Sequence, residues 1–224
     1  MENLQPVPGH LEPVPGTRSI FDAALVLASS EIGEAIRRRS EEFISAGRSG
    51  KERLFTELCF CILTANTSAE MGIRTIEAVG YHNLVSASET ELRNLLKGSR
   101  YRFYNLRARF IVSSRWIIDD LPGLVKSRDH FGSREYLVDN VMGLGYKEAS
   151  HFLRNVGVFD FAILDKHILK LITREFRMPS VKPTSRKRYL EIESLFVDRS
   201  RQLGFEPGIL DLYLWYMATG KILK

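Results

Sequence analysis

Six residues near the middle of the chain combine a tight turn with a reactive amine: Gly143-Leu144-Gly145-Tyr146-Lys147-Glu148. The Gly-x-Gly turn stands between two amphipathic stretches, and this pattern predicts a helix-hairpin-helix element. In such an element the turn and the N-terminus of the following helix present backbone N–H groups to a DNA phosphate. We therefore expect Gly143 and Gly145 to form a phosphate-binding hairpin.

Lys147 directly follows this turn, and Asp165 stands further along the chain. An amine and a carboxylate at these positions could act on one sugar carbon of the DNA, the amine as nucleophile and the carboxylate as a stabiliser of positive charge. Two simpler interpretations stay open from the residues alone. A Gly-x-Gly hairpin can be a non-catalytic DNA clamp whose lysine only contacts phosphate, and Asp165 has the residue type of a helix N-cap.

The composition is that of an ordinary globular chain with a modest basic excess. Its 224 residues are 44% hydrophobic and 26% charged, and the net charge is +5. No stretch approaches the roughly 18 apolar residues of a membrane span, and Met1 to Gly16 lacks the features of a signal peptide, so we expect a cytoplasmic protein, associated with the nucleoid through DNA. A mildly basic surface can serve solubility alone. The basic residues form clusters, however, and such clusters favour an anionic polymer as partner. The basic clusters are Arg37-Arg38-Arg39, then Lys97, Arg100, Arg102, Arg107 and Arg109, and then Lys182, Arg186, Lys187 and Arg188.

Metal chemistry is not indicated by the sequence. The only cysteines, Cys59 and Cys61, are two positions apart on a predicted helix, so they point away from each other and cannot readily share a metal or form a disulfide. A conventional iron–sulfur cluster needs four thiolates, and the histidines have no zinc-binding spacing. We therefore expect no metal site and no iron–sulfur cluster.

Helical periodicity dominates the chain, and strand alternation is nearly absent, so the sequence predicts an all-α protein. Apolar spacing, caps and breakers predict helices at 51–65, from Ser68 to about Val79, from Ser88 to Gly98, and from Phe103 to Ile118, where Pro122-Gly123 ends the segment. Residues 1–17, with their repeated Pro-Val-Pro-Gly, are expected to form an extended arm.

The second half of the chain predicts helices on both sides of the turn and beyond it. Ser133 is expected to cap the first hairpin helix, and 146–156 to form the second, which ends at Gly157. Asp165 opens a helix that ends near Phe176. Thr184 or Ser185 begins the next helix, and Pro207 fits the first turn of the last.

These residues carry a family resemblance. The run from Val141 to Gly157, together with Ala162-Ile163-Leu164-Asp165-Lys166-His167, resembles the helix-hairpin-helix DNA glycosylases related to endonuclease III. The match is closest to their bacterial and archaeal 8-oxoguanine branch, the second class of oxoguanine glycosylases. It extends through 62–70, 101–105 and the terminal 219–224, and so covers nearly everything after residue 20.

The resemblance implies a bifunctional repair enzyme that removes 8-oxoguanine and then nicks the abasic site by β-elimination. It makes Lys147 the nucleophile and Schiff-base amine, and it gives Asp165 the role of the carboxylate that stabilises the sugar cation. Reaching a base inside duplex DNA requires its extrusion from the stack. Phe103 matches the family's wedge residue, and Asn66 matches the loop residue that contacts the vacated site or the orphaned base. From the residues alone, a core phenylalanine and a helix-capping asparagine remain open.

The last predicted helix carries the candidate base pocket. Asp211 and Trp215 are four positions apart and share a helix face, which suits one group that accepts hydrogen bonds and one that stacks on a purine. The resemblance assigns both to recognition of oxoguanine and adds the C-terminal Lys224. A core tryptophan beside a solvent-facing aspartate is the alternative.

The resemblance also implies a two-lobed fold. A helical barrel of about 48–158 is expected to carry the hairpin, and 18–47 with 159–224 to form the second lobe. We expect a monomer that binds double-stranded DNA containing oxidised guanine and needs no organic cofactor. The hairpin carbonyls could hold a monovalent cation. Other damaged bases, or DNA binding without catalysis, are the competing functions.

Overall fold

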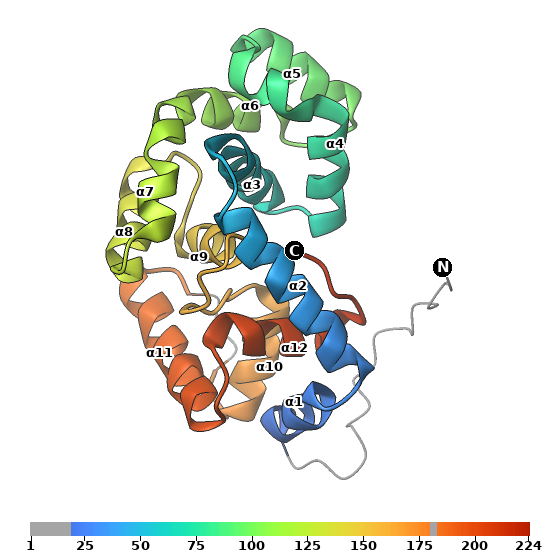
Figure 1. Ribbon diagram of the computed structural model, residues 1–224, viewed down its shortest axis with the longest axis vertical. Helices are drawn as coiled ribbons and strands as arrows, with labels where there is room; N and C mark the ends of the chain where they lie inside the picture. The colour runs from blue at the N-terminus through green and yellow to red at the C-terminus, as the bar shows by residue number, and fades with distance from the viewer. Residues whose placement is uncertain (1–18, 180–182) are drawn as a thin grey trace. The chain divides into compact units, whose positions relative to one another are not determined.

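The computed structural model describes residues 19–179 and 183–224 (Figure 1). The arm predicted at 1–17 lies outside these residues. Within the described ranges the chain forms helices and no strand, so the prediction of an all-α fold is confirmed. None of the helices in this part of the chain is both long and apolar enough to cross a membrane.

The helices follow one another in the order α1 Ile20–Ala28, α2 Glu31–Gly47, α3 Lys51–Thr64, α4 Ala69–Ser86, α5 Glu89–Gly98, α6 Tyr104–Ser113, the 3₁₀ helix η1 Arg115–Asp119, α7 Leu121–Lys126, α8 His130–Asn140, α9 Tyr146–Asn155, α10 Lys166–Glu175, α11 Arg186–Gln202 and α12 Pro207–Thr219.

The chain divides into two compact units. The hairpin unit is the continuous segment Phe43–Val158, and the flanking unit combines the chain up to Glu42 with Phe159–Lys224. The division falls at Phe43, within α2, a few residues before the approximate bound of 48 that the resemblance implies.

The hairpin unit is built around α3, which packs against α4, α6, α7, η1 and α9. Its residues Leu58 and Ile62 are fully buried, and each such side chain stabilises the fold by about 1.5–3 kcal/mol. Gly72 lets α4 lie close to α3, because a Cβ at this position would come within 2.8 Å of the Thr64 side chain. The unit therefore has a core of its own.

The two ends of the hairpin unit lie against each other. A Cβ on Gly47, at the end of α2, would come within 2.0 Å of the Val156 carbonyl oxygen, which follows α9. Gly157 has a φ of +85°, and a Cβ there would come within 2.8 Å of the Ile44 Cα. Both glycines are needed because backbone meets backbone at this point.

The flanking unit is built around α12, which packs against α1, α10 and α11. The α12 residues Leu210 and Leu214 are fully buried, as are Ile168 of α10 and Phe196 of α11. One apolar helix surrounded by three others gives this unit its core.

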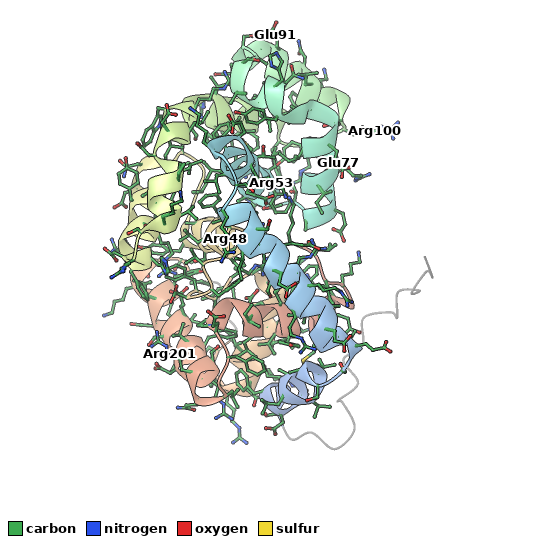
Figure 2. All side chains as sticks on the ribbon, viewed as in Figure 1. Arg48, Arg53, Glu77, Glu91, Arg100 and Arg201 are labelled. Carbon is green, nitrogen blue, oxygen red and sulfur yellow. The ribbon has the colours of Figure 1, made fainter. Side chains whose placement is uncertain are left out.

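Most of the predicted helix ends are confirmed. Ser68 accepts a hydrogen bond from the Met71 N–H, and Ser185 accepts one from the Arg188 N–H. Ser88 and Glu91 form the expected capping box, and Figure 2 shows Glu91 in the first turn of α5. Pro207 begins α12. Side chains that satisfy the free N–H groups of a helix start are readable from sequence, because their partners are only a few residues away.

Two predicted ends were wrong. Asp129 caps α8, accepting a hydrogen bond from the Gly132 N–H at 2.8 Å, while the Ser133 hydroxyl donates to the Leu124 carbonyl. Pro122 does not end a helix but lies in the first turn of α7, where its missing N–H costs nothing. The end predicted near Val79 is confirmed as a kink, because the chain leaves helical geometry at Gly80, with φ +72°, before it continues helically to Ser86.

Candidate functional site

The hairpin joins α8 to α9 through Val141–Gly145, as predicted. Gly143 has a φ of +88°, a region that favours glycine, and a Cβ there would come within 2.3 Å of the Phe110 ring. Gly145 is exposed and forms the N-cap of α9. Position 143 therefore requires glycine for two reasons, its backbone angle and its close approach to an aromatic ring.

Lys147 lies in the first turn of α9, and its side chain is 26% exposed. Its Nζ lies 3.2 Å from Oε1 of Glu148. The other carboxylate oxygen of Glu148, Oε2, accepts a hydrogen bond from the Gly145 N–H at 3.3 Å. Glu148 thus contacts both the helix start and the amine.

Sequence reasoning missed Glu148 as part of this site. A signal was present, because glutamate at the third helical position is the residue type that reaches back to the N-cap N–H. The additional contact with the neighbouring lysine could not be read from that pattern.

The first turns of α9 are fixed to α8 by a buried arginine. Arg134 is 1% exposed, and its Nη1 donates a hydrogen bond to the Ser150 hydroxyl at 3.1 Å. Its guanidinium also lies 5.3 Å from the centre of the Tyr146 ring, and the Tyr146 hydroxyl donates to Glu135 at 2.7 Å. These contacts on both sides of Lys147 hold its backbone in one place.

Asp165 is the N-cap of α10, the simpler of the two roles considered for it. Its Oδ1 accepts hydrogen bonds from the N–H groups of His167 and Ile168, both at 2.8 Å. A carboxylate at this point is stabilised by the positive end of the helix dipole. Capping does not exclude a catalytic role, because both bonds use the same oxygen atom.

Asp211 is buried, with 1% exposure, and its Oδ1 accepts a hydrogen bond from the Ile163 N–H at 3.0 Å. The solvent-facing aspartate considered as an alternative is therefore wrong. Trp215, one turn later on α12, is half-buried, as is Lys224. A carboxylate can accept several hydrogen bonds, and one of those at Asp211 comes from the backbone of Ile163.

Asn66 and Phe103 both lie at the ends of helices in the hairpin unit. Asn66 is exposed and has a φ of +63°, and it does not cap α4, since Ser68 does. Phe103 is half-buried, immediately before α6, with the Arg102 guanidinium 4.5 Å from its ring centre. Asn66 is therefore not a helix cap, and Phe103 is not a fully buried core residue.

The predicted site residues fall into two groups. Lys147, Gly143, Gly145, Phe103 and Asn66 belong to the hairpin unit, and Asp165, Asp211, Trp215 and Lys224 belong to the flanking unit. Within the described residues, no group of three or more histidine, cysteine, aspartate or glutamate side chains could hold a metal ion. Burial raises the pKa of the Cys59 thiol, which lies in the α3 core.

A family profile and a curated relative both match this chain. The family profile Ogg-HhH, described as 8-oxoguanine DNA glycosylase, matches residues 36–205. The 8-oxoguanine DNA glycosylase/AP lyase of Thermoplasma acidophilum is 57% identical over 198 residues, which are 88% of this chain and 96% of that protein.

Solved structures show the same fold. The crystal structure of the 8-oxoguanine DNA glycosylase of Thermotoga maritima matches with a TM-score of 0.85 and 43% identity, over 92% of this chain and 98% of that one. The Methanocaldococcus jannaschii 8-oxoguanine glycosylase/lyase, in complex with a 15mer DNA containing 8-oxoguanine, matches with a TM-score of 0.87 and 41% identity, over 92% and 99% of the two chains. The family profile matches most of this chain, and a curated relative is more than half identical to it. The chain therefore belongs to the helix-hairpin-helix family of 8-oxoguanine DNA glycosylases.

Proposed function

We propose that this chain removes 8-oxoguanine from double-stranded DNA and cleaves the resulting abasic site, as a bifunctional glycosylase and lyase. The observation that supports this most directly is the position of Lys147. It is a partly exposed amine in the first turn of α9, directly after a Gly-x-Gly hairpin. Relatives of the chain carry the name 8-oxoguanine DNA glycosylase/AP lyase.

Lys147 acts as the nucleophile in this proposal. Its neutral amine attacks C1′ of the extruded nucleotide, and the N-glycosidic bond breaks, with its electron pair leaving on the base, which takes up a proton. Positive charge develops at the sugar in this step, and the Asp165 carboxylate stabilises it electrostatically. The nitrogen then loses a proton, and its lone pair breaks the C1′–O4′ bond, so that the sugar ring opens to an imine and O4′ takes up a proton as a hydroxyl.

The same imine accounts for the lyase reaction. It makes the C2′ proton acidic, and loss of that proton expels the 3′ phosphate by cleavage of the C3′–O bond. Water then hydrolyses the imine and returns the Lys147 amine. Every step uses groups of the chain, the DNA and water, so no organic cofactor is needed.

Base selection is assigned to the flanking unit. The N1–H and N2–H donors of a guanine-type edge need acceptors, and an ionised aspartate only accepts. We assign this role to Asp211, with Trp215 stacking on the purine and Lys224 completing the pocket. Phe103 fills the gap left by the extruded base, and Asn66 contacts the vacated site.

The remaining properties follow from the same reaction. We expect the protein to act as a monomer on DNA of the nucleoid, in the cytoplasm. The hairpin carbonyls could hold a monovalent cation beside the phosphate that the Gly143 and Gly145 backbone binds.

Borohydride trapping tests the proposal. Wild-type protein mixed with an oxoguanine duplex and borohydride should become covalently linked to DNA, because the reagent reduces only an imine. Lys147→Gln should give no linked product while its affinity for undamaged duplex stays within about three-fold, since hairpin contacts come from backbone. Trapping of this variant at the wild-type rate would assign the nucleophile elsewhere. Absence of trapping and of base release with the wild type, despite tight DNA binding, would support a non-catalytic clamp.

A further inference from the structure

Two loops of the hairpin unit carry the residues assigned to the DNA gap. One is the turn between α3 and α4, which contains Asn66, and the other is the segment between α5 and α6, which contains Phe103. Asn66 and Phe103 are far apart in sequence, and both would have to reach the same opening in the duplex. Their relative placement therefore matters more than the position of either alone.

Arg107, on α6, joins these two loops. Its Nη2 donates a hydrogen bond to the Ala65 carbonyl at 2.8 Å, at the residue directly before Asn66. The same guanidinium lies 5.3 Å from the centre of the Phe110 ring, on α6 itself, and 6.0 Å from the centre of the Phe103 ring, which also has the Arg102 guanidinium 4.5 Å away. A single side chain thus donates a hydrogen bond to the backbone of one loop and lies beside the aromatic ring of the other.

Tyr101 joins the segment between α5 and α6 to the end of α3, just before the turn that contains Asn66. Its hydroxyl donates a hydrogen bond to the Leu63 carbonyl at 2.5 Å, in the last turn of α3. Burial raises the pKa of this phenol, against weaker opposing effects of its hydrogen bonds with Arg107 and Thr67. Tyr101 therefore stays a hydrogen-bond donor, two residues before Phe103.

The chemistry of Arg107 is unusual for a purely structural residue. It is 5% exposed, so its charge is removed from water, and this costs free energy that a leucine or methionine would not. What the arginine supplies instead is a planar group with several donors, which can hold a carbonyl and an aromatic face at once. The two carbonyls that it and Tyr101 satisfy belong to the end of α3, where no further helical turn follows.

We infer that Arg107, supported by Tyr101, is a positioning residue that holds Phe103 and Asn66 as one rigid element for filling the DNA gap. The inference rests on the proposed roles of those two residues. Without Arg107 the two loops would enter the duplex separately, and the extruded state would lose part of its stabilisation. Chemistry at an abasic site, where no base has to be held out of the stack, would depend on Arg107 much less.

The test compares Arg107→Met with a matched control, Arg115→Met. Arg115 lies in the same unit and makes the same kind of contact, donating to the Leu84 and Ala87 carbonyls at 2.9 and 2.7 Å around the end of α4. It contacts neither gap loop in these bonds. Single-turnover rates would be measured at a temperature where each variant is folded, on an oxoguanine duplex and on a preformed abasic duplex. A 2-aminopurine opposite the lesion would report on unstacking.

Arg107→Met should slow oxoguanine excision by at least about ten-fold and the 2-aminopurine fluorescence rise in parallel, because small misplacements of positioning groups are costly. Its β-elimination rate should stay within about three-fold of wild type, and Arg115→Met should leave both rates unchanged. Arg107→Lys should recover only part of the excision, since it keeps the charge but not the planar group.

Several outcomes would overturn the inference. Arg107→Met could excise at the wild-type rate, it could lose excision and β-elimination equally, or the Arg115 control could be slowed as much. If Arg107→Met does not fold, Arg107→Lys and Tyr101→Phe take its place, with the same expected separation of the two rates. Failure of the proposed function is distinguishable, because the wild type itself would then neither release oxoguanine nor form the trapped complex.

Discussion

At the scale of single residues, Asp165 contributes to the helix and, in our proposal, to the chemistry, and two substitutions separate these contributions. Asp165→Asn retains the Oδ1 acceptor that binds the His167 and Ile168 N–H groups but removes the charge. We expect the melting temperature to stay close to wild type and excision to fall by about a hundred-fold or more, since charge stabilisation at the sugar is lost.

Asp165→Ala is the companion variant, because it removes the cap as well. It should lower the free energy of unfolding by about 1 kcal/mol, measured by denaturant titration, and abolish excision too. If Asp165→Asn excised at the wild-type rate, the carboxylate would have only its capping role.

Lys224 lies in the short segment that follows α12. Gly220 ends α12 with a φ of +71°, its N–H donating to the Tyr216 carbonyl, and the chain turns there toward its half-buried last residues. Deleting Lys224 should impair oxoguanine removal and spare β-elimination at a preformed abasic site, because only the first reaction needs base recognition. Single-turnover rates on the two duplexes would show the difference.

Lys221→Ala is the control for this deletion, since it removes a lysine charge from the same segment at an exposed position. A Lys224 deletion with a wild-type excision rate would exclude a role for the terminus in the pocket.

How much of the site was predictable also depends on the residue. Lys147 and Asp165 stand in local patterns, a turn and a helix start, so their sequence neighbours identified them. Arg107 was predicted only as one member of a basic cluster, because the carbonyl that it binds is on Ala65, directly after another helix and far away in sequence. Asp211 was predicted as a pocket residue from its place on the helix and from the family resemblance, but its hydrogen bond with Ile163 was not predicted, for the same reason.

At the scale of elements, the hairpin turn is limited by contact as well as by backbone angle. In Gly143→Ala the new Cβ would meet the Phe110 ring, and the residue would have to adopt φ +88°. We expect a loss of about 1–3 kcal/mol in the free energy of unfolding and weaker binding to undamaged duplex, measured by thermal unfolding and fluorescence anisotropy.

Gly98→Ala provides the comparison, because nothing lies within 4 Å of the position that its Cβ would take. It should leave DNA binding unchanged and change the free energy of unfolding by no more than about 1 kcal/mol. Equal effects of the two variants would show that contact with Phe110 is unimportant.

Helix positions were predicted well where a cap and its partner are close in sequence, as at Ser88 and Ser185. Errors arose where several residues could play the same part. Asp129 and Ser133 are both capping types, and only the packing of α8 beside α7 decides between them. Pro122 likewise suits an end or a beginning of a helix.

At the scale of the whole molecule, the net charge of +5 predicts how binding responds to salt. Affinity for undamaged duplex should fall steeply as salt rises, because counterions released from the DNA supply much of the driving force. The logarithm of the binding constant, plotted against that of the salt concentration, should be linear with a slope of several units. A flat plot would mean that the basic clusters do not contact the backbone.

The two-lobed organisation came from the family resemblance rather than from composition, since the boundaries lie in helical or well-packed sequence without a linker. The division at Phe43 falls inside the continuous helix α2, where nothing in the sequence changes. Only three-dimensional packing separates the units at that point.

The contact between the two ends of the hairpin unit has a consequence for synthesis. Gly47 and Gly157 lie where the two ends of the hairpin unit meet. Because this unit is one continuous segment, all of its residues leave the ribosome before any of Phe159–Lys224 does. This unit can complete its core on the nascent chain, as domains commonly do. The buried face of α1, with Phe21 and Ala24, must instead wait for α12, which is made after the hairpin unit. A growing chain therefore acquires the turn that we propose binds DNA before the helix that we propose recognises the base.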